Sequence, residues 1–303
     1  MDNDVTGGHP PAYSGGHLDR AGTLRADPSW IERRLADPRV RVIPLWQSRC
    51  LIGPGGPVRL VGADAAKVLA ADAEPVFLGL TSADEPVFAV DLSDLAEPEA
   101  LAAASADRVL DVRAMVGELD PAEAAIQAHA RGMLHWHRNQ HHCGSCGART
   151  RSRADGGVRI CTGCGRELYP QLHPAVIAVV ESSDGRSCLL ARHCGAGPDG
   201  FSLLAGFVDV GESLEDAVRR EVFEETGVRV GEVVYLASQA WPFPAGLMVG
   251  FRARALSEQV TVDPVEIEEA RWFTRVELRQ RQAAGGTFGR VDSIDRLLMQ
   301  AWL

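Results

Sequence analysis

The chain has 303 residues, a formal net charge of −10 and 46% hydrophobic residues, with a mean hydropathy of −0.06. This length allows two domains with separate cores, and the acidic balance excludes a protein whose whole surface binds nucleic acid or an anionic membrane. No apolar run approaches the roughly 18 residues of a membrane-spanning helix, and the N-terminus has no basic-then-apolar signal sequence. We therefore expect a cytoplasmic protein without a membrane partner.

Residues 1–27 are rich in Gly, Pro, His and Asp and show no periodicity. This composition predicts a disordered tail, and we expect no metal site at His9 and His17.

Residues 28–138 predict an N-terminal α+β domain. The runs "RVRVIPLW", "VRLVG", "PVFLGLT" and "PVFAVDL" are rich in β-branched residues and separated by Pro, Gly and Asp, which predicts a small antiparallel sheet. Residues 97–140 are rich in Ala and Leu at helical spacing, and Asp120 with Pro121 predicts the start of the last helix. We find no catalytic constellation here and expect a scaffold or dimerising domain.

Residues 139–168 carry two pairs of cysteines, each with the spacing CxxC and with adjacent glycines: Cys143, Cys146, Cys161 and Cys164. Four thiolates at this spacing suit a structural Zn²⁺ in a zinc ribbon, with a closed coordination sphere that leaves no catalytic position. Disulfides are the alternative, which a cytoplasmic location disfavours. We expect ordinary cysteines at 50, 188 and 194.

Residues 138–168 are locally basic, with six arginines against Asp155 and Glu167. The arginines stand at positions 138, 149, 151, 153, 159 and 166. We favour a solubilising surface, and the alternative is an electrostatic guide for an anionic chain such as RNA.

Residues 169–303 alternate strands and helices. The predicted strands are "HPAVIAVVES", "SCLLARH", "FSLLAGFVDV", "VVYLASQAW", "GLMVGFRARAL" and "EARWFTRVEL". One helix lies within residues 206–228, after Ser213 and before Gly227, and another begins at Ser293. This order predicts an α/β sandwich.

The first of these helices places carboxylates on its apolar face. At about 100° per residue, Glu221 and Glu225 fall within the apolar stripe and Glu224 at its edge, beside Leu214, Ala217, Val218 and Val222. Glutamates at this spacing also occur on solvated faces, but burying unpaired carboxylates costs several kcal/mol. Either the carboxyls share protons, or a hard cation such as Mg²⁺ binds among them and serves phosphate chemistry.

Gly206, Glu212 and the segment "REVFEETGV" at 220–228 resemble the Nudix box at every fixed position. The resemblance implies a Nudix α/β/α sandwich and hydrolysis of nucleoside diphosphates linked to another group. It implies Mg²⁺ or Mn²⁺, with Glu221, Glu224 and Glu225 as ligands or as the base. It also implies that Arg220 orients these carboxylates and that the carbonyl of Ala205 is a ligand.

The segment "SQAWPFPAG", residues 238–246, resembles the signature of the NADH pyrophosphatase subgroup, as does the order N-terminal domain, ribbon, Nudix box, signature. Ala240 replaces a proline and Gly246 a serine of that signature. The aromatic faces of Trp241 and Phe243 suit ring stacking. The resemblance implies a substrate site built from Tyr169, Phe207, Gln239, Ala240, Trp241, Pro242, Phe243, Pro244, Ala245, Gly246 and Glu266. Glu266 also binds metal or acts on the pyrophosphate, whereas Glu268 and Glu269 are expected to be solvated.

From this resemblance we expect hydrolysis of NAD(H) to nicotinamide mononucleotide and AMP, removal of NAD caps from RNA, and a homodimer. The alternatives are a Nudix hydrolase for another dinucleotide or ADP-ribose, which the changes at 240 and 246 favour, and an RNA-binding regulator with a vestigial box. The expected organisation is a tail (1–27), an N-terminal domain (28–138), a zinc ribbon (139–168) and a Nudix domain (169–303).

Overall fold

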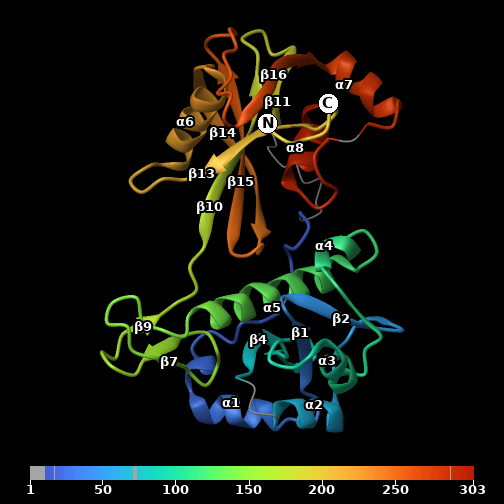
Figure 1. Cartoon of the computed structure of the whole chain (residues 1–303), viewed down its shortest axis with the longest axis vertical. Coiled ribbons are helices and arrows are strands. Elements are labelled where there is room, and N and C mark those ends of the chain that lie inside the picture. Colours follow the sequence, from blue (N-terminus) through green and yellow to red (C-terminus); the bar gives the residue numbers. More distant parts are fainter. Residues whose placement is uncertain (1–10, 17, 71–73, 287) are drawn as a thin grey trace. The chain divides into compact units, whose positions relative to one another are not determined.

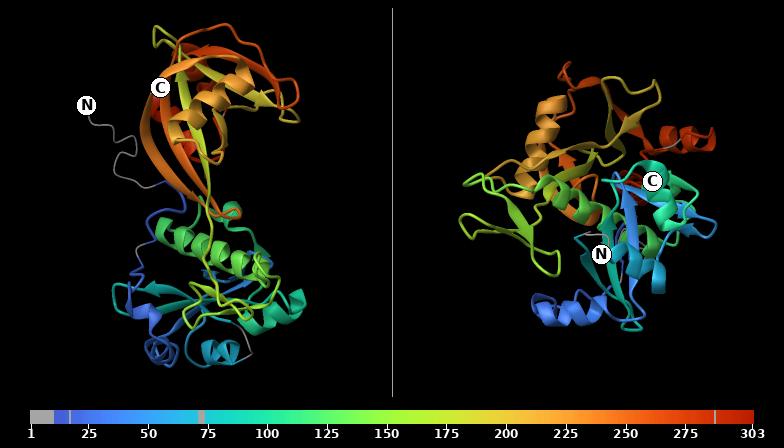
Figure 2. Two further views of the ribbon diagram at one scale, coloured as in Figure 1. Left: turned by 90° about the vertical axis from the view of Figure 1, so that its left-hand side faces the viewer. Right: turned by 60° about the horizontal axis from the view of Figure 1, so that its bottom comes forward.

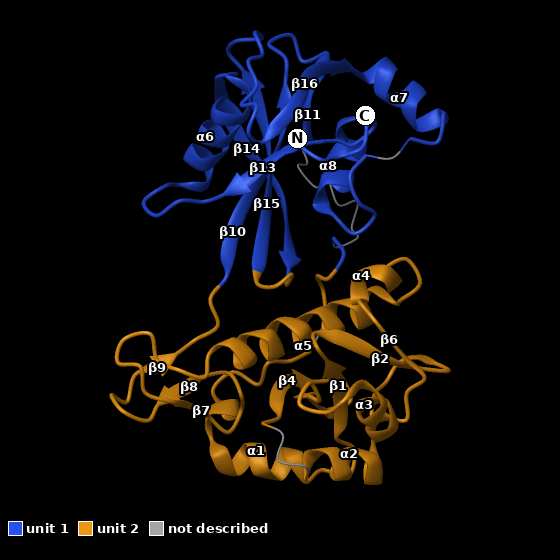
Figure 3. Ribbon diagram, in the orientation of Figure 1, with its two compact units in different colours: residues 1–12, 172–241, 246–303 blue, residues 13–171, 242–245 orange. Residues whose placement is uncertain are grey.

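The computed structural model describes residues 11–16, 18–70, 74–286 and 288–303, so His9 and His17 lie outside the described residues. The chain forms two compact units (Figure 3), unit 1 mainly from Leu172–Trp241 and Gly246–Leu303, and unit 2 from Tyr13–Gln171 and Pro242–Ala245. Within the described ranges, no helix has the length and apolar character needed to span a bilayer.

Unit 2 contains a six-stranded sheet in the order β3-β2-β1-β5-β4, with β6 paired to β2. Its strands are β1 (Arg41–Trp46), β2 (Arg49–Gly53), β3 (Gly56–Pro57), β4 (Val76–Leu80), β5 (Pro86–Asp91) and β6 (Arg108–Leu110). Its helices are η1 (Leu24–Ala26), α1 (Pro28–Leu35), α2 (Gly62–Leu69), α3 (Glu97–Ala104), α4 (Val112–Met115) and α5 (Pro121–Asn139).

The prediction of a purely antiparallel sheet is wrong, because β1 pairs with β5 in parallel. β1 and β2 form one hairpin and β4 and β5 another. The connection through α2 returns the chain so that the second hairpin joins beside β1 (Figure 1). Strand β6 interrupts the stretch expected to be helical, since it pairs with β2. The start of α5 is confirmed: Asp120 accepts hydrogen bonds from the N–H groups of Ala122 and Glu123.

Residues 18–27 are ordered, so the prediction of a disordered tail is wrong for this part. Asp19 and Leu80 exchange backbone hydrogen bonds of 2.9 and 2.8 Å, and Ala21 is buried in the core of unit 2. Gly79 has a φ of +147°, and a Cβ there would lie 2.7 Å from the carbonyl oxygen of Asp19. The segment therefore packs so closely against β4 that only glycine fits at position 79.

The cysteine-rich segment forms a three-stranded sheet of β7 (Thr150–Ser152), β8 (Arg159–Cys161) and β9 (Glu167–Leu168). A buried polar network joins it to the rest of unit 2. Arg159 donates to Glu74 at 2.7 Å and to the hydroxyl of Thr150 at 2.8 Å, and Asp155 accepts from Arg25 at 2.8 Å. The ribbon is thereby fixed to the N-terminal domain by paired charges.

Unit 1 contains a seven-stranded sheet in the order β12-β11-β10-β15-β14, with β13 paired to β10 and β16 to β11. Its strands are β10 (His173–Glu181), β11 (Ser187–His193), β12 (Phe201–Ser202), β13 (Leu204–Phe207), β14 (Val230–Trp241), β15 (Gly246–Ala255) and β16 (Ile267–Thr274). Its helices are α6 (Leu214–Thr226), α7 (Arg275–Ala283) and α8 (Ile294–Trp302).

This sheet has an apolar core on each face. Along β10, Val176, Ala178 and Val180 belong to one core, which α6 covers, whereas Ile177 and Val179 belong to the other, which α7 and α8 cover. This alternation is the period-2 pattern of a strand buried on both faces. Figures 1 and 2 show α6 and α8 on opposite faces of the sheet. The predicted α/β/α sandwich is confirmed.

The helix boundaries in unit 1 follow local signals. Ser213 accepts from the N–H of Asp216 at the start of α6, and Gly227, with a φ of +69°, ends it. Ser293 begins α8 as predicted. The strand predicted for "EARWFTRVEL" is too long, because Thr274 and Glu277 form a capping box that starts α7.

Candidate functional site

The carboxylates of α6 surround one guanidinium. Arg220 donates to both oxygens of Glu212 at 2.7 and 2.9 Å, to Glu221 at 2.9 Å and to Glu224 at 3.0 Å. It also donates to the carbonyl of Phe207 at 2.8 Å. Arg220 thus holds two carboxylates of the helix and both ends of the loop before it.

Glu225 lies deeper than the other carboxylates, with 4% of its surface exposed. Burial, together with the charges of Glu221, Glu266 and Glu224, raises its pKa to about 8. Burial also raises the pKa of Glu221. Among the described residues, none donates a hydrogen bond to the buried Oε2 of Glu225. An oxygen ligand that is buried, surrounded by like charges and unsatisfied fits a hard divalent cation.

Gly206 allows the approach of β13 to this helix. A Cβ at position 206 would lie 1.9 Å from the carboxyl carbon of Glu221. Ala205 pairs with Ile177 of β10 in the preceding register position. The glycine of the box therefore leaves the space that the carboxylate of Glu221 fills.

Glu266 is distinguished from its acidic neighbours by its surroundings. Its charge contributes to the raised pKa values of both Glu221 and Glu225, so it lies within electrostatic range of these carboxylates. Glu268 and Glu269 instead form ion pairs with Arg192. The role of Glu266 at the metal or the pyrophosphate stays a prediction, and its electrostatic effect on Glu221 and Glu225 supports it.

The expected base-binding residues are divided between the two units. Phe207 is 65% exposed on unit 1. Tyr169 belongs to unit 2, where its exposed ring donates a hydrogen bond to Glu167. Trp241 and Gly246 pair at the ends of β14 and β15, and a Cβ at 246 would lie 3.0 Å from the carbonyl oxygen of Trp241. The glycine at 246 is thus closely packed.

Gln239 is not placed to bind substrate. It is 1% exposed, and its amide donates to the carbonyls of Ala12 at 3.1 Å and Asp292 at 2.7 Å. Its carbonyl accepts from the N–H of Ile294 at 2.7 Å. These bonds use both donors of the amide and tie β14 to the start of α8, so the expectation of a substrate ligand at 239 is wrong.

The loop Pro242–Ala245 groups with unit 2. Arg131 donates to the carbonyl of Pro242 at 2.5 Å. The guanidinium carbons of Arg113 and Arg131 each lie 4.8 Å from the centre of the Phe243 ring, and Tyr13 contacts that ring edge-on at 4.9 Å. The ring predicted to stack on substrate therefore makes cation–π contacts within the protein.

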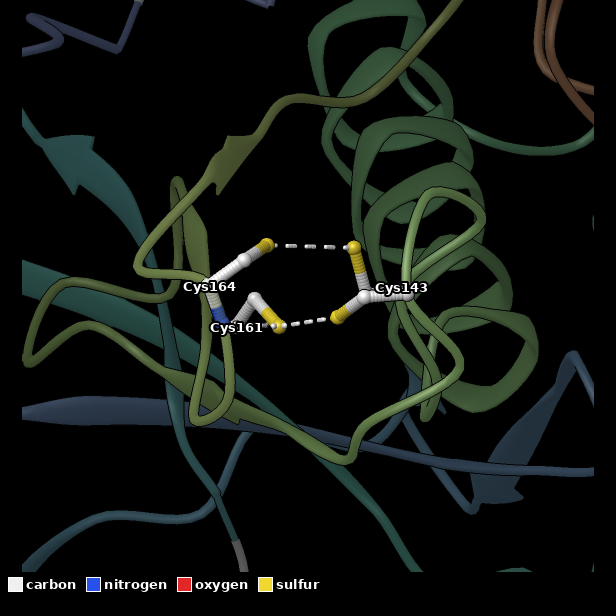
Figure 4. A group of neighbouring side chains, drawn as sticks. Cys143, Cys161 and Cys164 are labelled. Atoms are coloured by element: carbon white, nitrogen blue, oxygen red, sulfur yellow. Dashed lines mark hydrogen bonds between the residues drawn. The ribbon is translucent and has the colours of Figure 1, made fainter.

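The four ribbon cysteines form the second candidate metal site. Their sulfur atoms all lie within 4.8 Å of one another, and all seven cysteines of the chain are free. Figure 4 shows Cys161 and Cys164 facing Cys143, with Sγ separations of 3.9 Å for 143–164 and 3.4 Å for 146–161. Sulfurs bound to one tetrahedral Zn²⁺ at about 2.3 Å are separated by about 3.8 Å. The set fits Zn²⁺.

The turn at the second pair favours thiolate. The N–H groups of Cys164 and Gly163 each lie 3.4 Å from Sγ of Cys161. The amide of Cys164, followed by that of Gly163, lowers the pKa of Cys161 to about 6. Hydrogen bonds from backbone amides favour the charged form of this sulfur.

Three of the six arginines within residues 138–168 form ion pairs with carboxylates of the protein. Arg138, Arg153 and Arg159 form ion pairs with Asp91, Asp155 and Glu74 respectively. Arg149, Arg151 and Arg166 remain exposed. The buried pairs were not predicted from sequence, because Arg159 and Glu74 are far apart in the chain.

Two domain families match the chain. A NUDIX domain matches residues 171–294, and a NADH pyrophosphatase-like rudimentary NUDIX domain matches residues 40–136.

Curated relatives and a solved structure also match parts or most of the chain. The NAD-capped RNA hydrolase NudC of Mycobacterium tuberculosis is 35% identical over an alignment of 314 positions, covering 96% of this chain and 94% of that protein. The human NAD-capped RNA hydrolase NUDT12 is 45% identical over 166 residues, covering 52% of this chain and 36% of that protein. The chain therefore matches only about a third of the length of that relative. A NUDIX hydrolase structure from Nitrosomonas europaea is 26% identical, with a TM-score of 0.39, covering 45% of this chain and 78% of that one. The chain belongs to the Nudix superfamily, and within it to the proteins that join an NADH pyrophosphatase-like domain to a Nudix domain.

Proposed function

We propose that this protein hydrolyses the pyrophosphate bond of NAD(H), giving nicotinamide mononucleotide and AMP, and removes NAD caps from the 5′ ends of RNA. The observation that carries the proposal is the buried, unsatisfied carboxylate of Glu225 beside Glu221 and Glu266. The name and near-complete coverage of the mycobacterial relative support the choice of substrate.

The proposed metal ligands are Glu221, Glu224, Glu225, Glu266 and the carbonyl of Ala205. These groups would hold a divalent cation, Mg²⁺ or Mn²⁺, which would supply charge neutralisation of the pyrophosphate and a lowered pKa of the attacking water. Arg220 keeps Glu221 and Glu224 in place. The attacking water forms a new O–P bond, one of the glutamates takes its proton, and the bridging P–O bond breaks to release the two mononucleotides.

The test is hydrolysis of NADH, ADP-ribose and NAD-capped RNA side by side, with Mg²⁺ and with Mn²⁺. We expect turnover of NADH and of capped RNA, and loss of both activities in Glu225→Gln. Glu215→Gln, which changes an exposed carboxylate of the same helix, is the matched control and should retain activity. No turnover by metal-replete wild-type protein would contradict the enzyme proposal and favour the regulator.

Hydrolysis of ADP-ribose is the second candidate. Ala240 and Gly246 depart from the subgroup signature, and Gln239 is held inside the protein rather than available to a nicotinamide. A kcat/KM for ADP-ribose equal to or above that for NADH would replace the first proposal by this one.

The zinc and the homodimer also remain proposals. We propose one structural Zn²⁺ on the four ribbon cysteines, supported by their sulfur separations. We propose a homodimer on the resemblance to the subgroup, which light scattering on the purified chain measures directly.

A further inference from the structure

A cavity of about 390 Å³ lies against the side of α6 that faces away from the catalytic carboxylates. It is lined by Arg219, Arg220, Phe223, Arg229, Val230 and Leu256. We call it the arginine pocket. Arg220 forms a wall shared with the catalytic site, since the same guanidinium binds Glu221 and Glu224. The pocket thus gathers three positively charged side chains in a chain whose net charge is −10.

Two of these arginines are available to an anion. Arg229 lies over the ring of Phe223, 5.3 Å from its centre, and no ion pair of its guanidinium is seen among the described residues. Arg219 pairs with Asp216 at 3.0 Å and donates to the carbonyl of Gly231 at 3.3 Å, but both charged side chains are exposed to solvent. Such a surface pair contributes at most about 1 kcal/mol, so an anionic ligand can redirect Arg219 at little cost.

The apolar part of the pocket suits a flat ring. Phe223 is 46% exposed and Leu256 is 71% exposed, and the buried Val230 also lines the pocket. A free inorganic anion would leave these apolar surfaces uncovered, and a purely apolar ligand would desolvate the arginines without pairing them. A ring joined to a phosphate satisfies both parts, because bases stack on aromatic side chains and arginine binds phosphate.

We propose that the arginine pocket binds a nucleotide of the RNA chain that follows the cap, with Phe223 stacking on its base and Arg229 and Arg219 binding its phosphate. The inference rests on the proposed removal of NAD caps and deepens it. A helix with its side chains is about 10–12 Å wide, and stacked nucleotides advance by about 3.4 Å. The strand therefore reaches the pocket about three nucleotides beyond the cleaved bond.

The variants Arg229→Gln and Phe223→Ala test the proposal. Each should lower kcat/KM for NAD-capped RNA of ten nucleotides by about tenfold, the scale of one lost stacking or phosphate contact, and leave kcat/KM for NADH unchanged. A capped RNA with a single nucleotide after the adenosine should behave like NADH. For Arg229→Gln, the slope of log(kcat/KM) against log[salt] should fall by about 0.7, as expected for one lost phosphate contact on a single strand.

Arg252→Gln is the matched control, because Arg252 is exposed on β15 but does not line the pocket. It should leave both substrates unchanged. The proposal would be overturned if Arg252→Gln lost as much kcat/KM for capped RNA as the pocket variants. It would also be overturned if the pocket variants lost kcat/KM equally for NADH and capped RNA, so that the ratio of the two values stayed unchanged. Thermal melting of each variant separates a loss of folding from a loss of binding.

Binding of an uncapped ten-nucleotide RNA, measured by fluorescence anisotropy, keeps this test independent of catalysis. Weaker binding by Arg229→Gln than by Arg252→Gln supports the pocket even if the wild-type protein hydrolyses no capped RNA, which would refute the proposed function alone. Equal binding by the two variants, with capped RNA hydrolysed normally by both, refutes the pocket alone. Two results together would show that the pocket binds an acidic segment of a protein instead. These are displacement of the RNA by an acidic peptide, and RNA binding that Phe223→Ala leaves unchanged.

Discussion

Single residues decide whether the carboxylates of α6 sit in a productive position. Arg220 holds Glu221 and Glu224 from one side, and the missing Cβ of Gly206 leaves room on the other. Because Glu221 is the flexible member of that contact, a larger residue at 206 displaces the carboxylate rather than the strand.

Gly206→Ala should therefore strongly lower activity while the protein still folds. We expect kcat to fall by about a hundredfold, the scale of a displacement of about 1 Å in a catalytic group, with little change in melting temperature. Gly197→Ala is the control, because a Cβ there meets no atom within 4 Å. A variant at 206 that melts early, or one that keeps full activity, would contradict this account.

Asp295, at the start of α8, gives unit 1 a predictable pH dependence. Burial raises its pKa from 3.8 to about 6. Between these values the folded protein binds more protons than the unfolded chain, so this group makes stability fall as pH rises from about 4 to 6. Its penalty is absent below that window and complete above it, at about 3 kcal/mol.

Asp295→Asn should remove this contribution to the dependence of the free energy of unfolding on pH. The test is the free energy of unfolding by urea at pH values from 4 to 7.5, in the wild type, in Asp295→Asn and in Asp94→Asn, which changes an exposed aspartate. An identical slope in wild type and Asp295→Asn would show that Asp295 ionises normally in the folded protein.

At the scale of elements, the ribbon brings together four cysteine side chains. Its three strands are short, so the proposed Zn²⁺ would supply folding free energy that a small apolar core lacks. We expect about one zinc per chain by elemental analysis, and none in Cys161→Ser. The melting temperature of that variant should fall by about 10 °C, since 1 kcal/mol shifts a domain of this size by about 2–4 °C. Cys194→Ser, at an exposed cysteine outside the ribbon, should change neither; zinc retained by Cys161→Ser would contradict the site.

The junction of β14 with α8 depends on Gln239. Its three buried hydrogen bonds contribute about 1 kcal/mol each, so Gln239→Leu should lose about 3 kcal/mol of unfolding free energy. Gln259→Leu, at an exposed glutamine, should lose almost none. A variant at 239 with unchanged stability and a raised KM for NADH would restore Gln239 as a substrate ligand.

At the scale of the whole molecule, local patterns were predictable and distant pairings were not. The box helix with its caps, the zinc cysteines and the start of α5 follow from residues within a few positions of one another. The parallel pairing of β1 with β5, the ion pair of Arg159 with Glu74 and the bonds of Gln239 to Asp292 and Ile294 join segments far apart in sequence. The periodicity of nearby residues does not indicate which distant residues will pair. The sequence therefore predicted that Gln239 binds substrate, whereas in the structure its side chain bonds to Asp292 and Ile294.

The pairing of Asp19 with Leu80 has a consequence for the behaviour of the chain in solution. β4 is the last strand of its sheet, and an uncovered border of this kind recruits strands from other molecules. The N-terminal segment occupies backbone groups of Leu80 and blocks that border. Deletion of residues 1–22 should therefore cause aggregation that grows with protein concentration in light scattering, whereas deletion of 1–10, which spares the pairing, should not. The N-terminal segment, which its composition predicts to be disordered, would then prevent β4 of one molecule from pairing with a strand of another.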